Sequence, residues 1–300
     1  MILLAVSGGI DSMYLANKAP ELYPGACFAV AHCNFHLRGE ESDADAAFVE
    51  EWCRNRSIRM FRADFDTLSY AKEHGLSIEM AARDLRYGWF ASLCAEHGFE
   101  AIAVAHNAND NAETLLLNML RGTGSKGLRG MSSDSSLRTP GGSVRILRPL
   151  LGLSRAEIER WMRAQGLGWR EDSTNAENDC KRNILRNKVF PLLGGINPSF
   201  VRTLNRDMAH FRLVDDVAED YFASCGMRLE DGVDIRALKA LKHWRYVLFR
   251  LVEPYGLSEE TFTKLVELLD SGRTVSGKVF QSPTHLISIK LKTMSVSTRQ

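Results

Sequence analysis

The sequence lacks the features that mark several large classes of protein. No two of its six cysteines form a C-x-x-C pair, and their spread does not suggest the disulfide frame of a secreted domain. No apolar run approaches the length of a membrane span, and the apolar start after Met1 is too short for a secretory segment and has no basic start. We therefore expect a cytoplasmic protein with reduced thiols and no membrane partner.

An excess of charge of either sign is also absent. The chain has 38 Lys and Arg against 37 Asp and Glu, which gives a formal net charge of +1. A nucleic-acid partner would therefore have to be held by a local basic patch, since no global field attracts it. The 300 residues, 45% of them hydrophobic, suit a globular protein of two domains.

Short apolar runs alternate with helical patterns in the first half of the chain. Strands are predicted at residues 2–6, 27–31, 58–61, 101–105 and 144–147. Helices are predicted at residues 12–18, 43–54, 78–97 and 112–120. This alternation predicts an α/β fold, a parallel sheet with helices on both faces. Ligands of such sheets bind beyond the carboxyl ends of the strands, so residues 7–12, 32–38 and 106–113 should converge on one crevice.

The second half of the chain has a different pattern. Residues 122–142 are rich in Gly and Ser and predict a mobile loop, and Ser154 with Glu157 forms a capping box that opens a helix. Further helices are predicted at residues 200–222, 235–252 and 259–269. We expect a larger domain over 1–190 and a smaller helical domain over 191–273. Residues 274–300 alternate like a strand and suggest the start of a truncated C-terminal segment.

The sharpest local signal is Ser-Gly-Gly-Ile-Asp-Ser at residues 7–12, between a predicted strand and a predicted helix. Glycines allow a tight turn that brings backbone N–H groups close to phosphate oxygens, and the helix adds its positive end. This loop fits neither the Walker A pattern nor G-x-G-x-x-G. Asp11 suits an anion site only with a Mg²⁺ ion between it and the phosphates. The alternative is a plain strand-to-helix turn.

This loop resembles the PP-loop of N-type ATP pyrophosphatases. The resemblance implies a grip on the β- and γ-phosphates, which leave as pyrophosphate while AMP passes to an oxygen of a second substrate. It also implies ATP and Mg²⁺ as cofactors, with Mg²⁺ on Asp11. The expected ATP-binding residues are Ser7, Gly8, Gly9, Ile10, Asp11, Ser12, His32 and Arg86. For His32 and Arg86 a structural or solvated role remains open.

Four further segments resemble the tRNA(Ile)-lysidine synthetase family within that class. They are residues 31–39, residues 81–87, residues 106–114 with 121–124, and the series 148–150, 171–175 and 182–186. Phe35 stands where that family commonly has His, and Asn107 replaces the second His of its H-H-x-x-D-x-x-E-T motif. The resemblance covers about residues 1 to 192.

The family resemblance implies that lysine is added to the wobble cytidine of the tRNA(Ile) with a CAU anticodon. ATP would adenylate the base oxygen at C2, and the ε-amine of L-lysine would displace AMP. That amine, with a pKa near 10.4, is protonated at neutral pH and needs a proton acceptor. We expect the catalytic residues to be Asp11, Asp110, Glu113 and His106. Asp110 and Glu113 share one helix face, where they could instead serve as a cap.

A local basic run follows at residues 181–206, which contain no Asp or Glu. We expect the domain over 1–190 to be catalytic and the helical domain over 191–273 to contact tRNA. The tRNA phosphates would bind this basic run, and an ordinary basic helix face is the alternative. The predicted RNA-binding residues are Lys181, Arg182, Arg186, Lys188, Arg202 and Arg206. Two rival functions remain, a tRNA thiolase of the same class and a non-catalytic adenine-nucleotide-binding protein. The sequence leaves the oligomeric state, a homodimer included, open.

Overall fold

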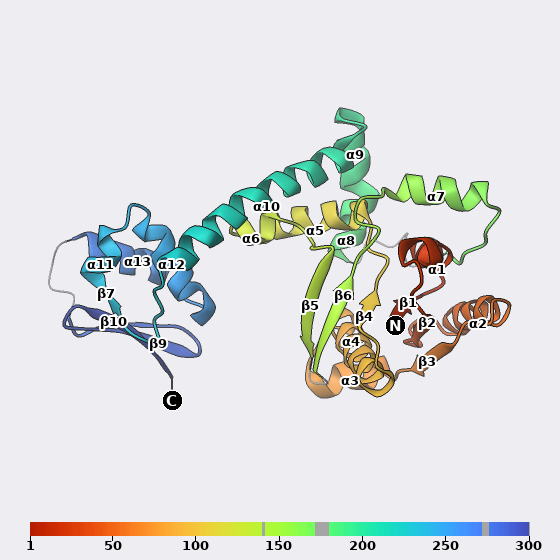
Figure 1. Cartoon of the computed structure of the whole chain (residues 1–300), viewed down its shortest axis with the longest axis horizontal. Helices are drawn as coiled ribbons and strands as arrows, with labels where there is room; N and C mark the ends of the chain where they lie inside the picture. Colours follow the sequence, from red (N-terminus) through yellow and green to blue (C-terminus); the bar gives the residue numbers. More distant parts are fainter. Residues whose placement is uncertain (140–141, 172–179, 272–275, 300) are drawn as a thin grey trace. The chain divides into compact units, whose positions relative to one another are not determined.

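The computed structural model divides the chain into two compact units, Met1–Arg212 and Leu213–Gln300 (Figure 1). It describes residues 1–139, 142–171, 180–271 and 276–299. The division falls inside a helix and differs from the expected boundary at 190/191. Within the described ranges, no helix is long and apolar enough to cross a membrane.

A six-stranded sheet forms the centre of the first unit, in the order β3-β2-β1-β4-β6-β5. All neighbours pair in parallel except β5 and β6, which are antiparallel. The strands are β1 (Ile2–Ala5), β2 (Phe28–Asn34), β3 (Met60–Asp64), β4 (Ala101–Ala103), β5 (Asp134–Thr139) and β6 (Gly142–Leu147). The predicted α/β class with a mostly parallel sheet is confirmed.

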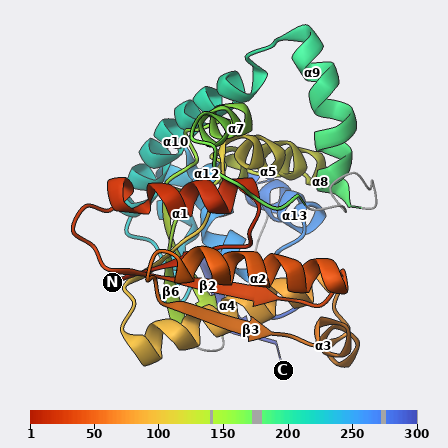
Figure 2. The ribbon, with the colours of Figure 1, turned by 90° about the vertical axis from the view of Figure 1, so that its right-hand side faces the viewer.

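Helices cover both faces of this sheet (Figure 2). One face packs against α1 (Ile10–Leu22), α2 (Glu40–Arg54) and α7 (Arg155–Ala164), and the other against α4 (Ile78–His97). A short helix, α3 (Thr67–His74), precedes α4 and packs against it. On β1, Leu4 faces the α1 side and Leu3 the α4 side, and neither is exposed. Burial on both faces explains the unbroken apolar run of this strand.

The strand order places a topological switch beside β1. The chain proceeds from β1 outward through β2 to β3, and then returns to add β4 on the opposite side of β1. The loops after β1 and β4 therefore diverge to opposite faces and leave a crevice at the carboxyl ends of these strands. Residues 7–12 and 106–113 lie there, as the sequence predicts.

The prediction of a mobile loop over residues 122–142 is wrong for most of its described part. A short helix, α6 (Ser125–Leu128), and strand β5 lie in this segment. Strand β5 has a Ser-rich sequence with little intrinsic strand preference. Its order comes from the antiparallel ladder with β6, which runs from Asp134 opposite Leu147 to Thr139 opposite Gly142.

A small separate core joins α5 (Ala108–Arg121) to the segment after residue 180. It consists of Ala112, Leu117, Leu185 and Phe190, all buried. The elements of this segment are α8 (Lys181–Ile184), a π-helical turn (Leu185–Val189), α9 (Phe190–Ile196) and α10 (Phe200–Ser224). This packing brings the predicted basic run against the helix that carries Asp110 and Glu113.

The second unit contains an antiparallel sheet in addition to the helices that the sequence predicts there. Its strand order is β7-β10-β9-β8, with β7 (Val233–Asp234), β8 (Lys278–Gln281), β9 (His285–Lys290) and β10 (Thr293–Thr298). Residues expected to begin a separate segment, 276–299 of those described, belong to this sheet. Its helices are α11 (Ile235–Ala240), α12 (Trp244–Val252), a 3₁₀ turn (Glu253–Tyr255) and α13 (Glu259–Asp270).

The single helix expected over 235–252 is two helices. Leu241, after α11, adopts an extended backbone (φ −72°, ψ 137°), and α12 starts at Trp244. The apolar periodicity continues across this break because both helices bury side chains in one core, Leu238 from α11 and Val247 from α12. Periodicity reports the buried face, so it does not reveal a turn between two helices that share that face.

Candidate active site

The loop between β1 and α1 makes a tight turn that depends on Gly8. Gly8 has φ +95°, a conformation that other residues adopt only with strain, and its carbonyl accepts a hydrogen bond from the Arg170 amide at 2.9 Å. Gly9 is the N-cap of α1, and no side chain of the described residues caps that helix. The helix therefore presents its first N–H groups to the crevice.

The hydroxyl of Ser12 organises the loop from within. The amides of Ser7 and Gly8 donate to Ser12 Oγ at 3.2 and 3.1 Å, and Ser12 Oγ donates to the Gly9 carbonyl at 2.8 Å. The Gly9 amide is directed at Ser7 Oγ, 3.4 Å away. Successive amides thus converge on rotatable hydroxyl groups, whose place an anionic oxygen can take as a stronger acceptor.

The loop opens onto a cleft of about 640 Å³. This volume lies in the range of sites that enclose a small molecule or cofactor. The side of the cleft toward α4 is largely apolar and the rest is polar. The described lining residues come from the ends of β1, β2 and β4, from α1, α4, α5 and α7, from the segment after α7 and from the π-helical turn. They include Ser7, Gly9, Ile10, Asp11, Ser12, Phe35, Arg86, Tyr87, Phe90, His106, Asn109, Asp110, Arg155, Arg170 and Arg186.

Asp11 lies at the start of α1 with its carboxylate in this cleft. Burial raises the pKa of Asp11, the Arg155 guanidinium opposes that shift, and the Asp110 carboxylate adds to it. One oxygen, Oδ2, forms an ion pair with Arg155, whereas Oδ1 is buried and has no hydrogen-bond partner among the described residues. A buried carboxylate oxygen without a partner, beside amides that face a phosphate site, fits a divalent cation.

The first turn of α5 forms one wall of the cleft and is a capping box. Asn107 Oδ1 accepts hydrogen bonds from the amides of Asn109 and Asp110, and Asp110 Oδ2 accepts from the Asn107 amide at 3.0 Å. The other oxygen, Asp110 Oδ1, lies 3.5 Å from Arg186 Nη2. One oxygen of Asp110 therefore caps the helix while the residue lines the cleft, and its expected catalytic role stays a prediction.

Glu113, one turn further along α5, is fully buried in a network with arginines. Arg186 donates to it twice, from Nε at 2.9 Å and from Nη2 at 3.2 Å, and Arg182 Nη1 lies 3.7 Å away. Burial raises the pKa of Glu113, and Arg186 opposes that shift. Because both of its oxygens are engaged and Glu113 does not line the cleft, its carboxylate holds the Arg186 guanidinium, which does line it.

His106, just before α5, also lines the cleft. Burial lowers the pKa of His106 to about 4, so the ring is neutral at physiological pH. Its Nδ1 is buried and has no hydrogen-bond partner among the described residues. An uncharged ring with an unsatisfied nitrogen suits a hydrogen bond to a ligand in the cleft.

Two asparagines fix the orientation of α5. Asn111 Nδ2 donates to Asn205 Oδ1 on α10 at 2.8 Å, and Asn205 Nδ2 donates to the Ala108 carbonyl at 2.9 Å. Asn111 Oδ1 also accepts from the Met131 amide at 2.6 Å. These bonds tie the start of α5 to α10 and to the segment before β5, so the acidic wall of the cleft is held from two sides.

Comparison with known proteins agrees with this geometry. The family model of the PP-loop domain matches residues 1–193, more than half of the chain. The chain belongs to the PP-loop family. A second model, the TilS substrate binding domain, matches residues 230–290.

Curated relatives match along most of the chain. A tRNA(Ile)-lysidine synthase of Porphyromonas gingivalis is 41% identical over 289 residues, which cover 95% of this chain and 61% of that protein. The tRNA(Ile)-lysidine synthase of Parabacteroides distasonis is 39% identical over 290 residues, with 95% and 63% covered. This chain thus spans about three fifths of the length of these relatives.

Among solved structures, the U34-tRNA thiolase NcsA from Methanococcus maripaludis, with its [4Fe-4S] cluster, is similar with a TM-score of 0.56. The two are 19% identical, and the match covers 71% of this chain and 72% of that one. At this identity the likeness shows a common fold.

The structure brings most of the predicted site residues together at the PP-loop. Arg86 lines the cleft with its guanidinium 5.1 Å from the Phe35 ring centroid. Gly8, His32 and Glu113 do not line the cleft. His32 is held elsewhere, since its Nδ1 bonds the Val6 carbonyl at 2.9 Å. Side chains alternate along β2, so Ala31 and Cys33 face the cleft while His32 points to the other side.

The predicted basic run separates into two groups. Arg182 and Arg186 face Glu113, and Arg186 reaches the cleft. The side chains of Lys181, Lys188, Arg202 and Arg206 are exposed. The first group is thus paired with a buried carboxylate, whereas the second lies at the surface, where Arg206 is 3.9 Å from the carboxylate of Asp207.

Two cleft arginines have no counterpart in the sequence-based prediction. Arg155 follows the Ser154 cap and is the first residue of α7, and its role becomes visible only because the start of α7 lies beside Asp11 of the PP-loop. Arg170 donates from Nε to Asp45 at 2.9 Å, and Asp45 also binds Arg38 at 2.8 Å. Neither pairing has a spacing that the sequence could reveal.

The structure describes only part of the fourth segment of the family resemblance, the series 148–150, 171–175 and 182–186. Glu171 lines the cleft, and residues 172–175 of the same motif lie outside the described residues. Arg148 donates from Nη1 to the Ser132 carbonyl at 2.9 Å and to Ser135 Oγ at 2.8 Å. This arginine therefore anchors the segment before β5.

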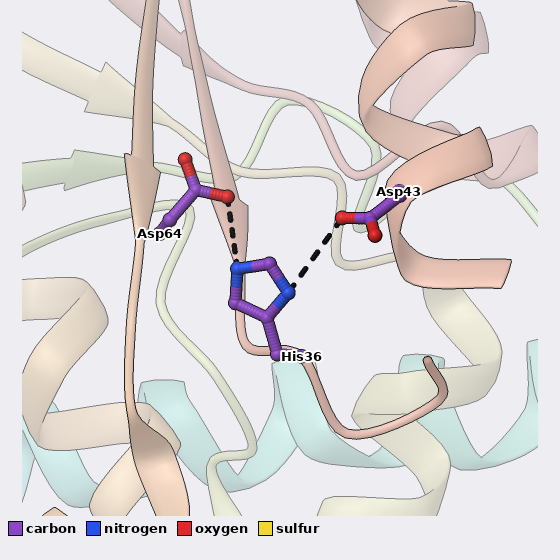
Figure 3. Close-up of side chains that lie close together, drawn as sticks. All are labelled: His36, Asp43 and Asp64. Carbon is purple, nitrogen blue, oxygen red and sulfur yellow. Dashed lines mark hydrogen bonds and ion pairs between the residues drawn. The ribbon is translucent and has the colours of Figure 1, made fainter. Parts of the chain in front are cut away.

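A histidine and two aspartates, His36, Asp43 and Asp64, lie close together on the surface (Figure 3). His36 Nε2 lies 3.0 Å from Asp64, and Nδ1 lies 3.6 Å from Asp43. Arg62 donates twice to Asp64, at 2.7 and 3.0 Å. A guanidinium thus already balances the acidic charge, and we assign no cation there.

Proposed function

We propose that the chain attaches lysine to the wobble cytidine of the tRNA(Ile) with a CAU anticodon and forms lysidine, AMP and pyrophosphate from ATP. The names of its relatives and the match of its second unit to the TilS substrate binding domain support this assignment. The observation that carries it is the shared cleft, onto which the PP-loop opens opposite the acidic first turn of α5. An activated nucleotide and a proton acceptor are thereby held side by side.

ATP binds in this proposal with its β- and γ-phosphates on the amides of residues 7–9 and at the start of α1. The apolar side of the cleft, which includes Tyr87 and Phe90, receives the base. Arg86 supplies a cation near the phosphates. Asp11 would hold Mg²⁺, which when bound neutralises phosphate charge. Its partnerless Oδ1 is the atom that fits this ion.

Each cleft residue has a separate role in the proposed reaction. The C2 oxygen of cytidine attacks the α-phosphate and releases pyrophosphate, and the lysine ε-amine then attacks C2 and releases AMP with that oxygen. Asp110 Oδ1, on the cleft side of the capping box, accepts the ammonium proton before the attack. His106 remains neutral and donates or accepts a hydrogen bond to the base. Glu113 acts as a positioning residue through Arg186.

The tRNA is bound in this proposal by the exposed basic side chains, Lys181, Lys188, Arg202 and Arg206. Contacts of this kind go to phosphates, so affinity falls with salt and carries no base specificity. The second unit supplies further substrate contacts, as its family match suggests. Self-association into a homodimer is also a prediction, which sedimentation of the full chain tests.

The thiolase alternative is not favoured. All six cysteines are free, and Cys33 is the one that lines the described part of the cleft. Burial raises the pKa of the Cys33 thiol to about 12, so it is protonated at neutral pH and a poor nucleophile. The other alternative, a nucleotide sensor, gives no purpose to the acidic wall of α5.

Incubation with ATP, labelled lysine and a tRNA(Ile) transcript, followed by nucleoside analysis, tests the proposal. Label should appear in one modified cytidine, with equal amounts of AMP and pyrophosphate. A transcript whose anticodon is GAU serves as the control and should remain unlabelled. Pyrophosphate release without lysine incorporation would exclude the ligase, and ATP binding without any release would favour the sensor.

A further inference from the structure

Arg155 forms an ion pair with the aspartate of the PP-loop. Its Nη1 donates to Asp11 Oδ2, and its side chain lines the cleft between α1 and α7. One oxygen of the carboxylate that we assign to Mg²⁺ is therefore already paired with a protein cation, while the other, Oδ1, is the atom assigned to the ion.

The backbone of Arg155 is fixed, while its side chain is accessible. The Arg155 amide donates to Asn109 Oδ1 at 3.1 Å, and the Ala108 amide donates to the Leu153 carbonyl at 2.8 Å. These bonds tie the start of α7 to the start of α5. The Arg155 side chain is 45% exposed, so rotation about its side-chain bonds can move the guanidinium without a backbone shift.

Two cations cannot share one carboxylate without mutual repulsion, whereas an incoming triphosphate provides new anionic oxygens beside it. A planar guanidinium matches phosphate oxygens well. We propose that Arg155 is a nucleotide-binding residue that leaves Asp11 for the triphosphate when ATP and its divalent cation enter the cleft. The inference rests on the proposed function in assuming that the cleft binds ATP.

This exchange predicts two effects of opposite sign when Arg155 is removed. Nucleotide affinity falls because a phosphate ligand is lost. The divalent cation binds at lower concentration because its competitor for Asp11 is gone. A residue with a merely structural role would weaken both, and an uninvolved residue would change neither.

Calorimetric titration with α,β-methylene ATP, whose α–β bridge is not cleaved, measures both effects without turnover. The dissociation constant at saturating Mg²⁺ and the Mg²⁺ concentration that gives half-maximal binding are recorded for each variant. For Arg155→Ala we expect the dissociation constant to rise about tenfold, as for one lost charge-assisted contact. The half-saturating Mg²⁺ concentration should fall about fivefold, the size of one partly exposed ion pair.

Matched variants isolate the cause. Arg160→Ala removes the same charge from an exposed position of α7 and should change neither reading. Arg155→Lys keeps a cation, so its Mg²⁺ requirement should stay near that of wild type. Its nucleotide affinity should lie between those of wild type and Arg155→Ala. In an Asp11→Asn background, Arg155→Ala should no longer alter the Mg²⁺ requirement.

The possible results separate the two proposals. Unchanged nucleotide affinity in Arg155→Ala, or a higher Mg²⁺ requirement, overturns the exchange. If the wild-type chain binds no nucleotide at any Mg²⁺ concentration, the proposed function fails as well. Should Arg155→Ala not fold by circular dichroism, Arg155→Gln provides the same two readings.

Discussion

Replacement of Glu113 by glutamine should separate stability from turnover. The substitution keeps the shape of the side chain, one carbonyl oxygen for Arg186, and the packing of α5. It removes the negative charge that receives both donors of the Arg186 guanidinium, at 2.9 and 3.2 Å. Arg186 itself lines the cleft, so the change acts on the site through its position.

The expected loss of stability is small. Breaking a buried ion pair typically costs about 3–5 kcal/mol when a charge is left buried without a partner. Here the remaining charge is on Arg186, whose side chain is 41% exposed and can be hydrated. Burial also raises the pKa of Glu113, which means that the buried carboxylate is destabilised by loss of hydration. A neutral glutamine amide does not have this desolvation penalty. We therefore expect a loss of about 1 kcal/mol, comparable to a surface pair.

The expected loss of turnover is much larger. A cleft arginine that is no longer clamped spends less time where charge develops on the phosphates. Loss of one such aligned contact typically lowers kcat about 100-fold, or about 2.7 kcal/mol. Lysidine formation under saturating substrates measures the rate, and urea unfolding measures the stability.

Glu159→Gln provides the matched control, because Glu159 pairs with Arg163 at 2.7 Å on the exposed face of α7. It should leave both turnover and stability near wild type. If Glu113→Gln turns over within twofold of wild type, Arg186 needs no clamp and the role assigned to Glu113 is wrong. A loss of several kcal/mol in stability would equally refute the argument from exposure.

Three further predictions concern the loop, the histidine and the basic patch. Gly8→Ala should lower stability by about 1–2 kcal/mol in denaturant unfolding, because φ +95° strains a side-chain-bearing residue; a variant as stable as wild type would contradict it. The pKa of His106 is about 4 in the folded chain against 6.5 in the unfolded chain, so the unfolded chain binds more protons between these values. The contribution of the neutral, buried His106 ring to the free energy of unfolding is therefore present above pH 6.5 and is lost as pH falls toward 4. The loss of stability over this range should be shallower in His106→Asn; identical plots of stability against pH for the two proteins would exclude burial of His106 as the cause. Arg202→Ala with Arg206→Ala should weaken tRNA binding and reduce its log–log salt slope by about 1–2, whereas an unchanged slope would place the tRNA elsewhere.

The tertiary structure determined which of the predicted polar residues share the cleft. His32 and Cys33 are neighbours in sequence, yet strand alternation turns one away from the cleft and the other toward it. Glu113 and Asp110 are one turn apart, yet only Asp110 lines the cleft. Such choices depend on which face each element buries, and a motif does not contain that information.

The sequence by itself determined the α/β class, the position of the PP-loop and the convergence of residues 7–12 and 106–113 on one crevice. These follow from local rules, since apolar runs, glycines and strand ends act over a few residues. Only the tertiary structure decided that Arg155 pairs with Asp11, and that Arg186 pairs with Glu113. The members of these pairs lie 144 and 73 residues apart along the chain. Packing of whole elements, rather than any local pattern, brings such partners together.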